Sequence, residues 1–493
     1  MKDQIKTTVS LFLLFSIFLF SCKTAALNSG ETLPIPKLES AFGTFKDDGI
    51  SNRRFNHADI QPLIAKHSGA FQISKLGESV EGRSISSLDW GNGKTKVMLW
   101  SQMHGNESTA TMSLFDLFNF LEASGDQYDE LRTTLKSQLD IKFIPMINPD
   151  GAEAFKRRNA LDIDLNRDAI SQISPEAVIL KKARDDFEPE FGFNLHDQQI
   201  YYNPVKTPKQ ATISVLAPAY NYATDVNDVR TKAMQVIVGM NAILQQVVPG
   251  HVGKYDDAFE PRAFGDNITK WGTSTILIES GGYPNDPEKQ YIRQLNFMII
   301  LNALEQIADK SYNQYTTAQY FSIPDNDSKL MDLILKEVQV PMKGQWYPID
   351  LAIKRRDISV GKEYYMSGIV DDLGDAQVYF GLEELDATGL RYKEGKVYDL
   401  PFDSISTIDE AKAMELLKQG YLALKVKSGA KGDLHALPIL VLNSTDSYES
   451  GWMTGANPTF YLEQDGVMKY AVVNGYLINL ENPKNQEFKQ RVY

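Results

Sequence analysis

Residues 97–121 read VMLWSQMHGNESTATMSLFDLFNFL, and this stretch decides the fold. Its first four residues, 97–100, form an uninterrupted apolar run that is typical of a buried strand. Apolar residues then recur at helical spacing, at Leu114, Leu117, Phe118 and Leu121. The stretch therefore predicts a buried strand that leads into a helix, with the mostly polar residues 101–109 between them.

The same alternation of strand and helix signals continues from about residue 40 to residue 310. Further apolar runs predict strands at Ile141 to Ile144, Phe191 to Leu195 and Thr275 to Ile278. Long helical patterns cover Asp228 to Val248 and Glu288 to Lys310. We therefore expect an α/β domain over 40–310, with a mixed, mostly parallel sheet flanked by helices on both faces. In such sheets, chemistry collects at the carboxyl ends of the strands.

The pattern changes after residue 310, and residues 311–493 predict a smaller β-rich C-terminal domain of unknown role. Short strand signals lie at Tyr364 to Val370, Val378 to Phe380, Leu422 to Val426 and Leu437 to Leu442. One helix is signalled by Thr407 and Glu410, which have the spacing of a capping box, and Gly420 suits its end.

The composition excludes several classes of protein. The chain has 493 residues, 64 acidic and 51 basic side chains, a net charge of −13 and one cysteine. One cysteine permits no intrachain disulfide and no thiolate metal cluster. The negative charge argues against a nucleic-acid partner. Any metal site must therefore use His, Asp and Glu, and the chain has only six histidines.

The first 22 residues predict a signal peptide of the lipoprotein type. Lys2 and Lys6 precede an uncharged apolar stretch that is too short to span a membrane and ends at Cys22. This arrangement resembles a bacterial lipoprotein signal, which implies cleavage before Cys22 and a lipid anchor on it. Residues 23–39 would be a tether. The protein would be exported and membrane-anchored, at the periplasmic face or outer membrane, touching the membrane only through its lipid.

Polar motifs follow several predicted strands in a fixed order. They are His104-Gly105-Asn106-Glu107, Asn148-Pro149-Asp150-Gly151, Arg157-Arg158-Asn159, Asp164-Leu165-Asn166-Arg167, Asn194-Leu195-His196-Asp197 and Ile278-Glu279-Ser280-Gly281-Gly282. Together they resemble the zinc carboxypeptidase family, the carboxypeptidase A/B-like metallopeptidases. The similarity extends from about Phe42 to Lys310 and includes Val80 to Ile85.

The resemblance implies one zinc ion per chain, held by His104, Glu107 and His196. It implies that Glu279 is the general base, which takes a proton from the metal-activated water. Arg157 would stabilise the negative oxygen that forms during hydrolysis, because a cation placed there acts mainly in the transition state. Its neighbour Arg158 is the alternative for this role.

Further roles follow from the same resemblance. Asn166 and Arg167 would bind the terminal carboxylate of the substrate, since a guanidinium meets a carboxylate through two hydrogen bonds. Asp164 would orient a zinc-binding histidine. Tyr255 is the nearest candidate for the substrate-capping tyrosine, although the surrounding residues match the family poorly. We expect structural roles for the remaining histidines, His57, His67, His251 and His435.

Three functions are compatible with these residues. The leading one is a metallocarboxypeptidase acting on peptides with a free C-terminus, with cell-wall peptides as one candidate class. The first alternative is a zinc-dependent N-acyl amino acid deacylase, because the aspartoacylase and succinylglutamate desuccinylase branch has a similar pattern of motifs. The second is a non-catalytic surface binding lipoprotein, which the presence of His104, Glu107, His196 and Glu279 disfavours.

Overall fold

The computed structural model describes residues 33–428, 431–449 and 451–493, and these residues group as one compact unit. The predicted signal peptide 1–22 and the anchor Cys22 lie outside the described residues. The end of the expected tether forms the start of helix α1 (Ile35–Phe45), in which Leu38 is buried. None of the described helices is both long enough and apolar enough to cross a membrane.

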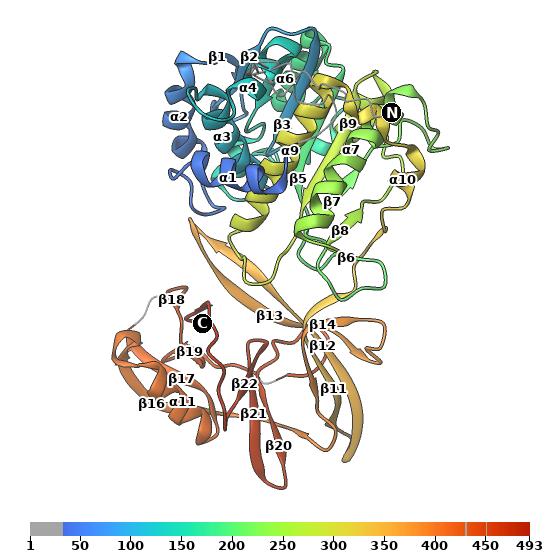
Figure 1. The fold of residues 1–493 in the computed structure, drawn as a ribbon. Coiled ribbons are helices and arrows are strands. Elements are labelled where there is room, and N and C mark those ends of the chain that lie inside the picture. The colour runs from blue at the N-terminus through green and yellow to red at the C-terminus, as the bar shows by residue number, and fades with distance from the viewer. Residues whose placement is uncertain (1–32, 429–430, 450) are drawn as a thin grey trace, which may run out of the picture. The chain divides into compact units, whose positions relative to one another are not determined.

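The central sheet has eight strands in the order β1-β2-β4-β3-β5-β9-β7-β8 (Figure 1). Its middle strands β4, β3, β5 and β9 run parallel, and antiparallel pairs β1–β2, β2–β4 and β7–β9 flank them. The predicted mixed, mostly parallel sheet is confirmed. The strands are β1 (Gln72–Glu78), β2 (Ser84–Gly91), β3 (Thr95–Ser101), β4 (Leu139–Ile144), β5 (Phe191–Asp197), β7 (Ile213–Leu216), β8 (Val252–Lys254) and β9 (Ser274–Ser280).

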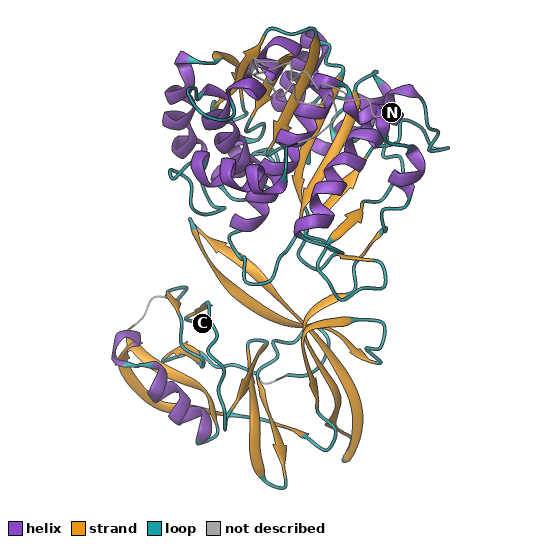
Figure 2. Cartoon of the chain, viewed as in Figure 1, coloured by secondary structure: helices purple, strands orange, loops and turns teal. Residues whose placement is uncertain are grey.

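Helices cover both faces of this sheet, as the alternation along β3 demonstrates (Figure 2). Val97 and Leu99 pack with α3 (Thr109–Glu122), α7 (Asp228–Val247) and α9 (Gln290–Asp309). Met98 and Trp100 point to the other face and pack with α6 (Pro175–Phe187) and α8 (Phe264–Lys270). Because both faces are buried, the centre of β3 is an uninterrupted apolar run, residues 97–100. The remaining helices here are α2 (His57–Lys66), α4 (Asp129–Gln138), α5 (Pro149–Glu153) and α10 (Thr317–Phe321).

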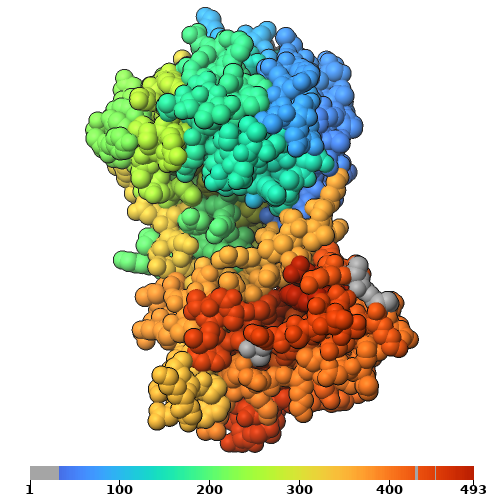
Figure 3. Space-filling view, turned by 180° about the vertical axis from the view of Figure 1, so that it is seen from behind, coloured from blue at the N-terminus to red at the C-terminus, as the bar shows by residue number. Residues whose placement is uncertain are grey.

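The region after residue 323 is rich in strands, as predicted. Its larger sheet holds β11 (Leu330–Met342), β12 (Gln345–Val360), β13 (Glu363–Gly374), β14 (Phe380–Asp386), β15 (Arg391–Lys393), β20 (Phe460–Gln464), β21 (Val467–Val473) and β22 (Tyr476–Asn479). A parallel sheet holds β16 (Lys396–Ser404), β17 (Tyr421–Ser428) and β19 (Leu440–Asn443). Short pairs join β6 (Asn203–Pro204) to β10 (Asn326–Asp327) and β18 (Leu434–His435) to β23 (Gln490–Arg491). In the space-filling view of Figure 3, residues of this region are coloured orange to red.

One local prediction in this region is wrong. Helix α11 (Glu410–Lys418) begins after Asp409, whose carboxylate accepts a hydrogen bond from the backbone amide of Lys412. Thr407 instead ends a 3₁₀ turn and donates its hydroxyl to the carbonyl oxygen of Ser404. Asp409 therefore caps the helix in place of Thr407. The predicted end of this helix is confirmed, because Gly420 has a φ of +94°.

Two predicted strands also begin later than expected. Strand β14 starts at Phe380, because the amide of Tyr379 donates to the carbonyl of Ala376 and closes a turn there. Strand β19 starts at Leu440, so residues 437–439 precede it. Short apolar runs indicate that a strand exists more securely than they indicate its ends.

Candidate active site

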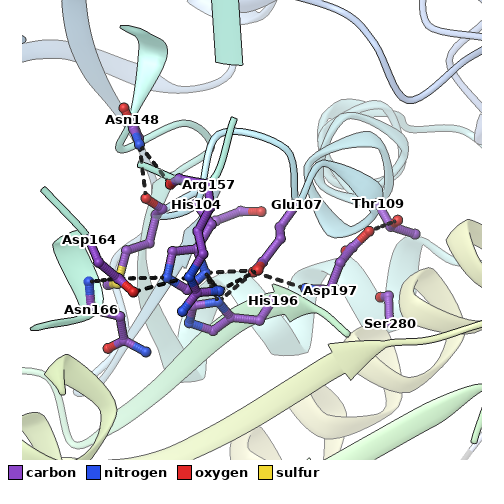
Figure 4. A network of polar contacts seen from close by, with 12 residues as sticks. His104, Glu107, Thr109, Asn148, Arg157, Asp164, Asn166, His196, Asp197 and Ser280 are labelled. Atoms are coloured by element: carbon purple, nitrogen blue, oxygen red, sulfur yellow. Dashed lines mark hydrogen bonds and ion pairs between the residues drawn. The ribbon is translucent and has the colours of Figure 1, made fainter. Parts of the chain in front are cut away.

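The central site residues lie at the carboxyl ends of three neighbouring parallel strands, β3, β5 and β9. Figure 4 shows His104, Glu107 and His196 close together. His104 and Glu107 occupy the loop between β3 and α3, and His196 is the second-last residue of β5. Glu279 is the second-last residue of β9 and stands directly opposite His196 in the sheet register. The order of the strands, β3-β5-β9, thus brings together side chains that are far apart in the sequence.

The loop that carries His104 is packed tightly against the start of α5. A Cβ atom on Gly105 would lie 2.0 Å from the carbonyl carbon of Gly151, so no larger residue fits there without movement. Asn148 is buried and donates its side-chain amide to the carbonyl oxygens of Met103 and Arg157. The Asn148-Pro149-Asp150-Gly151 motif therefore holds the His104 loop and the Arg157 segment together.

Asp150 of the same motif fixes the segment that precedes β2. Its carboxylate accepts hydrogen bonds from the Ser79 hydroxyl at 2.7 Å, the Glu81 amide at 3.0 Å and the Arg83 guanidinium at 2.7 Å. This contact gives a structural reason for the motif at Val80 to Ile85. Residues 79–83 thus pack against the motif that holds the His104 loop, without being part of the metal cluster.

Three candidate metal ligands converge on one point. Nδ1 of His104 lies 2.9 Å from Oε1 of Glu107, and Nδ1 of His196 lies 2.7 Å from Oε2 of the same carboxylate. The two Nδ1 atoms are 3.1 Å apart. Among the described residues, these three form the only group of His, Cys, Asp and Glu side chains arranged to hold a metal ion. The other four histidines do not join it.

Asp164 orients the first of these histidines. Its Oδ1 atom lies 3.0 Å from Nε2 of His104, while its Oδ2 atom accepts a hydrogen bond from Nε of Arg157 at 3.0 Å. A proton on Nε2 that points at a carboxylate leaves Nδ1 as an electron-pair donor. His104 therefore presents its free nitrogen to Glu107 and His196.

The charges of the cluster act on one another. Burial works to raise the pKa of Glu107, but His104 and His196 hold it well below its usual range. Burial would lower the pKa of His104, yet Glu107 and Asp164 raise it, whereas burial lowers the pKa of His196. Burial also opposes ionisation of Asp164, but His104 and Arg157 lower its pKa. The cluster thus keeps two ionised carboxylates around two imidazoles.

Glu279 has the opposite electrostatic character. It is buried, and burial together with the negative charges of Glu107 and Asp197 raises its pKa well above the usual range, while Arg157 and Lys289 act to lower it. A carboxylate with a raised pKa is a better proton acceptor. Two carboxylates in one site therefore have different properties, Glu107 fixed as an anion and Glu279 able to carry a proton.

The two neighbouring arginines lie in different places. Arg157 donates from Nη1 to Oε1 of Glu107 and to Nδ1 of His104, both at 3.1 Å. Arg158 is exposed and donates to the carbonyl oxygen of Asp162. Of the two, the structure brings only Arg157 to the cluster.

Asn166 and Arg167 lie beside the cluster, next to a hollow of about 440 Å³ that Arg158, Asp164, Arg167 and Arg262 help to line. Oδ1 of Asn166 accepts a hydrogen bond from the amide of Phe264, so this side chain is held in place. The guanidinium of Arg167 pairs with Glu260 at 3.2 Å. A ligand bound by Arg167 would share the guanidinium with Glu260 or replace it.

Tyr255 follows β8 and lies close to Glu279. Burial raises its pKa, and the nearby Glu279 and Tyr202 raise it further. Its ring centroid is 5.9 Å from that of Tyr202. Sequence reasoning missed Tyr202, because it lies in an irregular loop after β5.

Three further residues lie next to the metal cluster, namely Asp197, Thr109 and Lys289, and sequence reasoning gave none of them a role. Asp197 donates its backbone amide to Oε2 of Glu107 at 3.1 Å, and its side chain accepts hydrogen bonds from Thr109 and Lys289. The sequence did contain a signal for Lys289. Lys289 lies in the first turn of the helix predicted at Glu288 to Lys310, where a lysine faces the positive end of the helix dipole, which is unfavourable without a compensating partner.

The donor set fits a zinc ion. Two imidazole nitrogens and one carboxylate form a common zinc ligand set that leaves a position open for water. Nε2 of His104 is bound to Asp164, which is the supporting contact typical of zinc-binding histidines. The close approach of two electron-pair donors, the Nδ1 atoms at 3.1 Å, is favourable when a cation lies between them.

Comparison with known proteins points to one family. The model of the zinc carboxypeptidase family matches residues 57–198. An uncharacterized protein of Zymomonas mobilis is 27% identical over 147 residues, which are 29% of this chain and 38% of that protein. Carboxypeptidase 2 of Trichophyton tonsurans is 30% identical over 185 residues, 36% of this chain and 32% of the relative. The chain thus spans less than half of the length of these curated relatives.

Among solved structures, the metallo-carboxypeptidase from Burkholderia cenocepacia aligns with a TM-score of 0.42 and 19% identity. The alignment covers 52% of this chain and 70% of that chain.

Proposed function

Since residues 57–198 of this chain match the model of the zinc carboxypeptidase family, we propose that the protein is a zinc-dependent carboxypeptidase. It would hydrolyse the last peptide bond of substrates with a free C-terminus. The observation that carries the proposal is the convergence of His104, Glu107 and His196 beside a buried carboxylate with a raised pKa, Glu279.

His104, Glu107 and His196 would hold the metal. A zinc ion bound there would polarise the substrate carbonyl and lower the pKa of a water molecule towards about 7. Glu279 would accept a proton from the attacking water and donate it to the leaving amine. The raised pKa supports this role, because the carboxylate must carry the proton between the two steps.

Arg157 would stabilise the negative charge that develops on the carbonyl oxygen. Its Nη1 atom already lies 3.1 Å from Glu107, so it is directed at the metal ligands. Charge stabilisation of this type is a large contribution to catalysis of acyl transfer. Asn166 and Arg167 would bind the terminal carboxylate, and Tyr255 would close over the substrate.

A pair of matched peptides tests the proposal. The purified protein, loaded with zinc, is incubated with a peptide that ends in a free carboxylate and with the same peptide amidated at its C-terminus. We expect release of single C-terminal amino acids from the free peptide only. Equal cleavage of both peptides would indicate an endopeptidase. Hydrolysis of N-acetyl amino acids without peptide cleavage would indicate the N-acyl amino acid deacylase.

We also propose that the mature protein is a lipoprotein anchored through Cys22, which would keep the enzyme near cell-wall peptides. The proposal rests on the sequence of residues 1–22 alone. Metabolic labelling with a fatty acid, compared between the parent protein and Cys22→Ala, tests it. Equal labelling of the two would contradict the anchor.

A further inference from the structure

Lys289 is a buried lysine that joins the ends of two strands of the site. It lies directly before α9, and its side chain is only 5% exposed. The Nζ atom donates to Oδ2 of Asp197 at 2.9 Å and to the carbonyl oxygen of Ser280 at 2.8 Å. Asp197 ends β5 and Ser280 ends β9 (labelled in Figure 4), so one ammonium group binds both strand ends.

Each of the two residues that Lys289 contacts directly follows a residue of the candidate site in the sequence. Asp197 follows His196, and its backbone amide donates to Oε2 of Glu107 at 3.1 Å. Ser280 follows Glu279. The side chain of Asp197 also accepts a hydrogen bond from the hydroxyl of Thr109, at the start of α3. The contacts of Lys289 thus extend to Glu107, through the backbone of Asp197, and to the end of the strand that carries Glu279.

The position of Lys289 is unfavourable for a helix. Its φ is +51°, a left-handed conformation that costs energy for any residue except glycine. A cation at a helix start also opposes the helix dipole. Asp286 performs the capping instead, accepting hydrogen bonds from the amides of Gln290 and Tyr291. The side chain of Lys289 therefore does not cap the helix, and its partners are Asp197 and Ser280.

We infer that Lys289 is a positioning residue, which holds the strand end with the metal ligand His196 and the strand end with Glu279 at a fixed separation. The inference rests on the proposed function. In this role Lys289 keeps the carboxylates of Glu107 and Glu279 at fixed positions relative to the metal. Small displacements of such groups reduce rates strongly, because catalysis depends on alignment.

Two variants test this role. Lys289→Met leaves Asp197 buried without its cation, which is destabilising by itself. The double variant Lys289→Met/Asp197→Asn removes both charges and should recover the melting temperature. We expect the double variant still to bind zinc about 10–100-fold more weakly, by chelator competition, and to lose kcat by a similar factor with KM unchanged.

Lys310→Met is the matched control, because Lys310 is an exposed lysine with positive φ at the other end of α9. It should match the parent protein in both measurements. Lys289→Arg, which keeps a cation with several donors, should bind zinc more tightly than Lys289→Met. Recovery of zinc affinity and kcat in the double variant together with the melting temperature would overturn the inference. Zinc affinity is measured without a substrate, so a protein that cleaves no peptide would refute the proposed function and still test Lys289.

Discussion

Nε2 of His104 lies 3.0 Å from Oδ1 of Asp164, and this contact determines which nitrogen of the imidazole faces Glu107. The same carboxylate binds Arg157 through its other oxygen. Asp164 therefore connects a candidate metal ligand with the arginine beside it, and replacing it should affect the metal first.

We predict that Asp164→Asn weakens zinc binding about 10–100-fold, because the amide no longer favours a proton on Nε2 of His104. Chelator competition on the purified protein measures this. Asp162→Asn is the control, since Asp162 is an exposed carboxylate of the same segment and its positive φ suits asparagine. Equal affinities in parent and Asp164→Asn would show that the contact does not support the metal.

Glu279→Gln should keep zinc and lose activity. The amide has the same shape but cannot accept a proton, so we expect kcat to fall about 10²–10⁴-fold, the usual contribution of a general base. Zinc content and peptide hydrolysis are measured on one preparation. Turnover close to that of the parent protein would exclude Glu279 as the base.

Arg157→Ala and Arg158→Ala distinguish the two neighbouring arginines. Only Arg157 contacts Glu107 and His104, so Arg157→Ala should lower kcat about 10²–10³-fold with a smaller effect on KM. Arg158→Ala should remain within a few-fold of the parent protein in the same steady-state assay. A larger loss of kcat in Arg158→Ala would reverse the assignment.

Glu305 should make stability depend on pH. Burial raises its pKa from 4.5 to about 7, and its carboxylate accepts a hydrogen bond from the amide of Leu33. Between these two pH values the native state holds a proton that the unfolded chain has released, so the free energy of unfolding falls as pH rises through this window. The full penalty, up to about 3 kcal/mol, is present above pH 7.

Glu305→Gln should remove that penalty. The variant should unfold at a higher temperature than the parent protein at pH 8, and the difference should shrink towards pH 4. Thermal unfolding at several pH values measures it, with the exposed Glu130→Gln as control. A constant difference at all pH values would show that Glu305 does not titrate in this range.

The sequence predicted the central part of the fold and the location of the site for one physical reason. Apolar runs such as 97–100 and 275–278 belong to strands buried on both faces, and their ends are marked by polar motifs. Parallel strands bring their carboxyl ends to one edge, so residues such as His196 and Glu279 could be expected to meet. Strand order itself was not evident from any local pattern.

Features for which two nearby residues were equally suitable, or which depend on the path of a loop, could not be predicted from the sequence. Thr407 and Asp409 are both good helix caps, and only the 3₁₀ turn before α11 decides between them. The contact between Lys289 and Asp197 depends on how the loop after β9 folds back, which no periodicity describes. The ring contact between Tyr202 and Tyr255 could not be predicted for a similar reason, because both residues lie in irregular segments after strands.

The position of β9 has a consequence for biosynthesis. This strand is the last of its sheet along the chain, yet it lies between β5 and β7, which are made earlier. A growing chain therefore exposes His104, Glu107 and His196 before it contains Glu279. In the proposed enzyme, the nascent chain would therefore contain the metal ligands before the general base, and hydrolysis would begin only after the final strand inserts into the middle of the sheet.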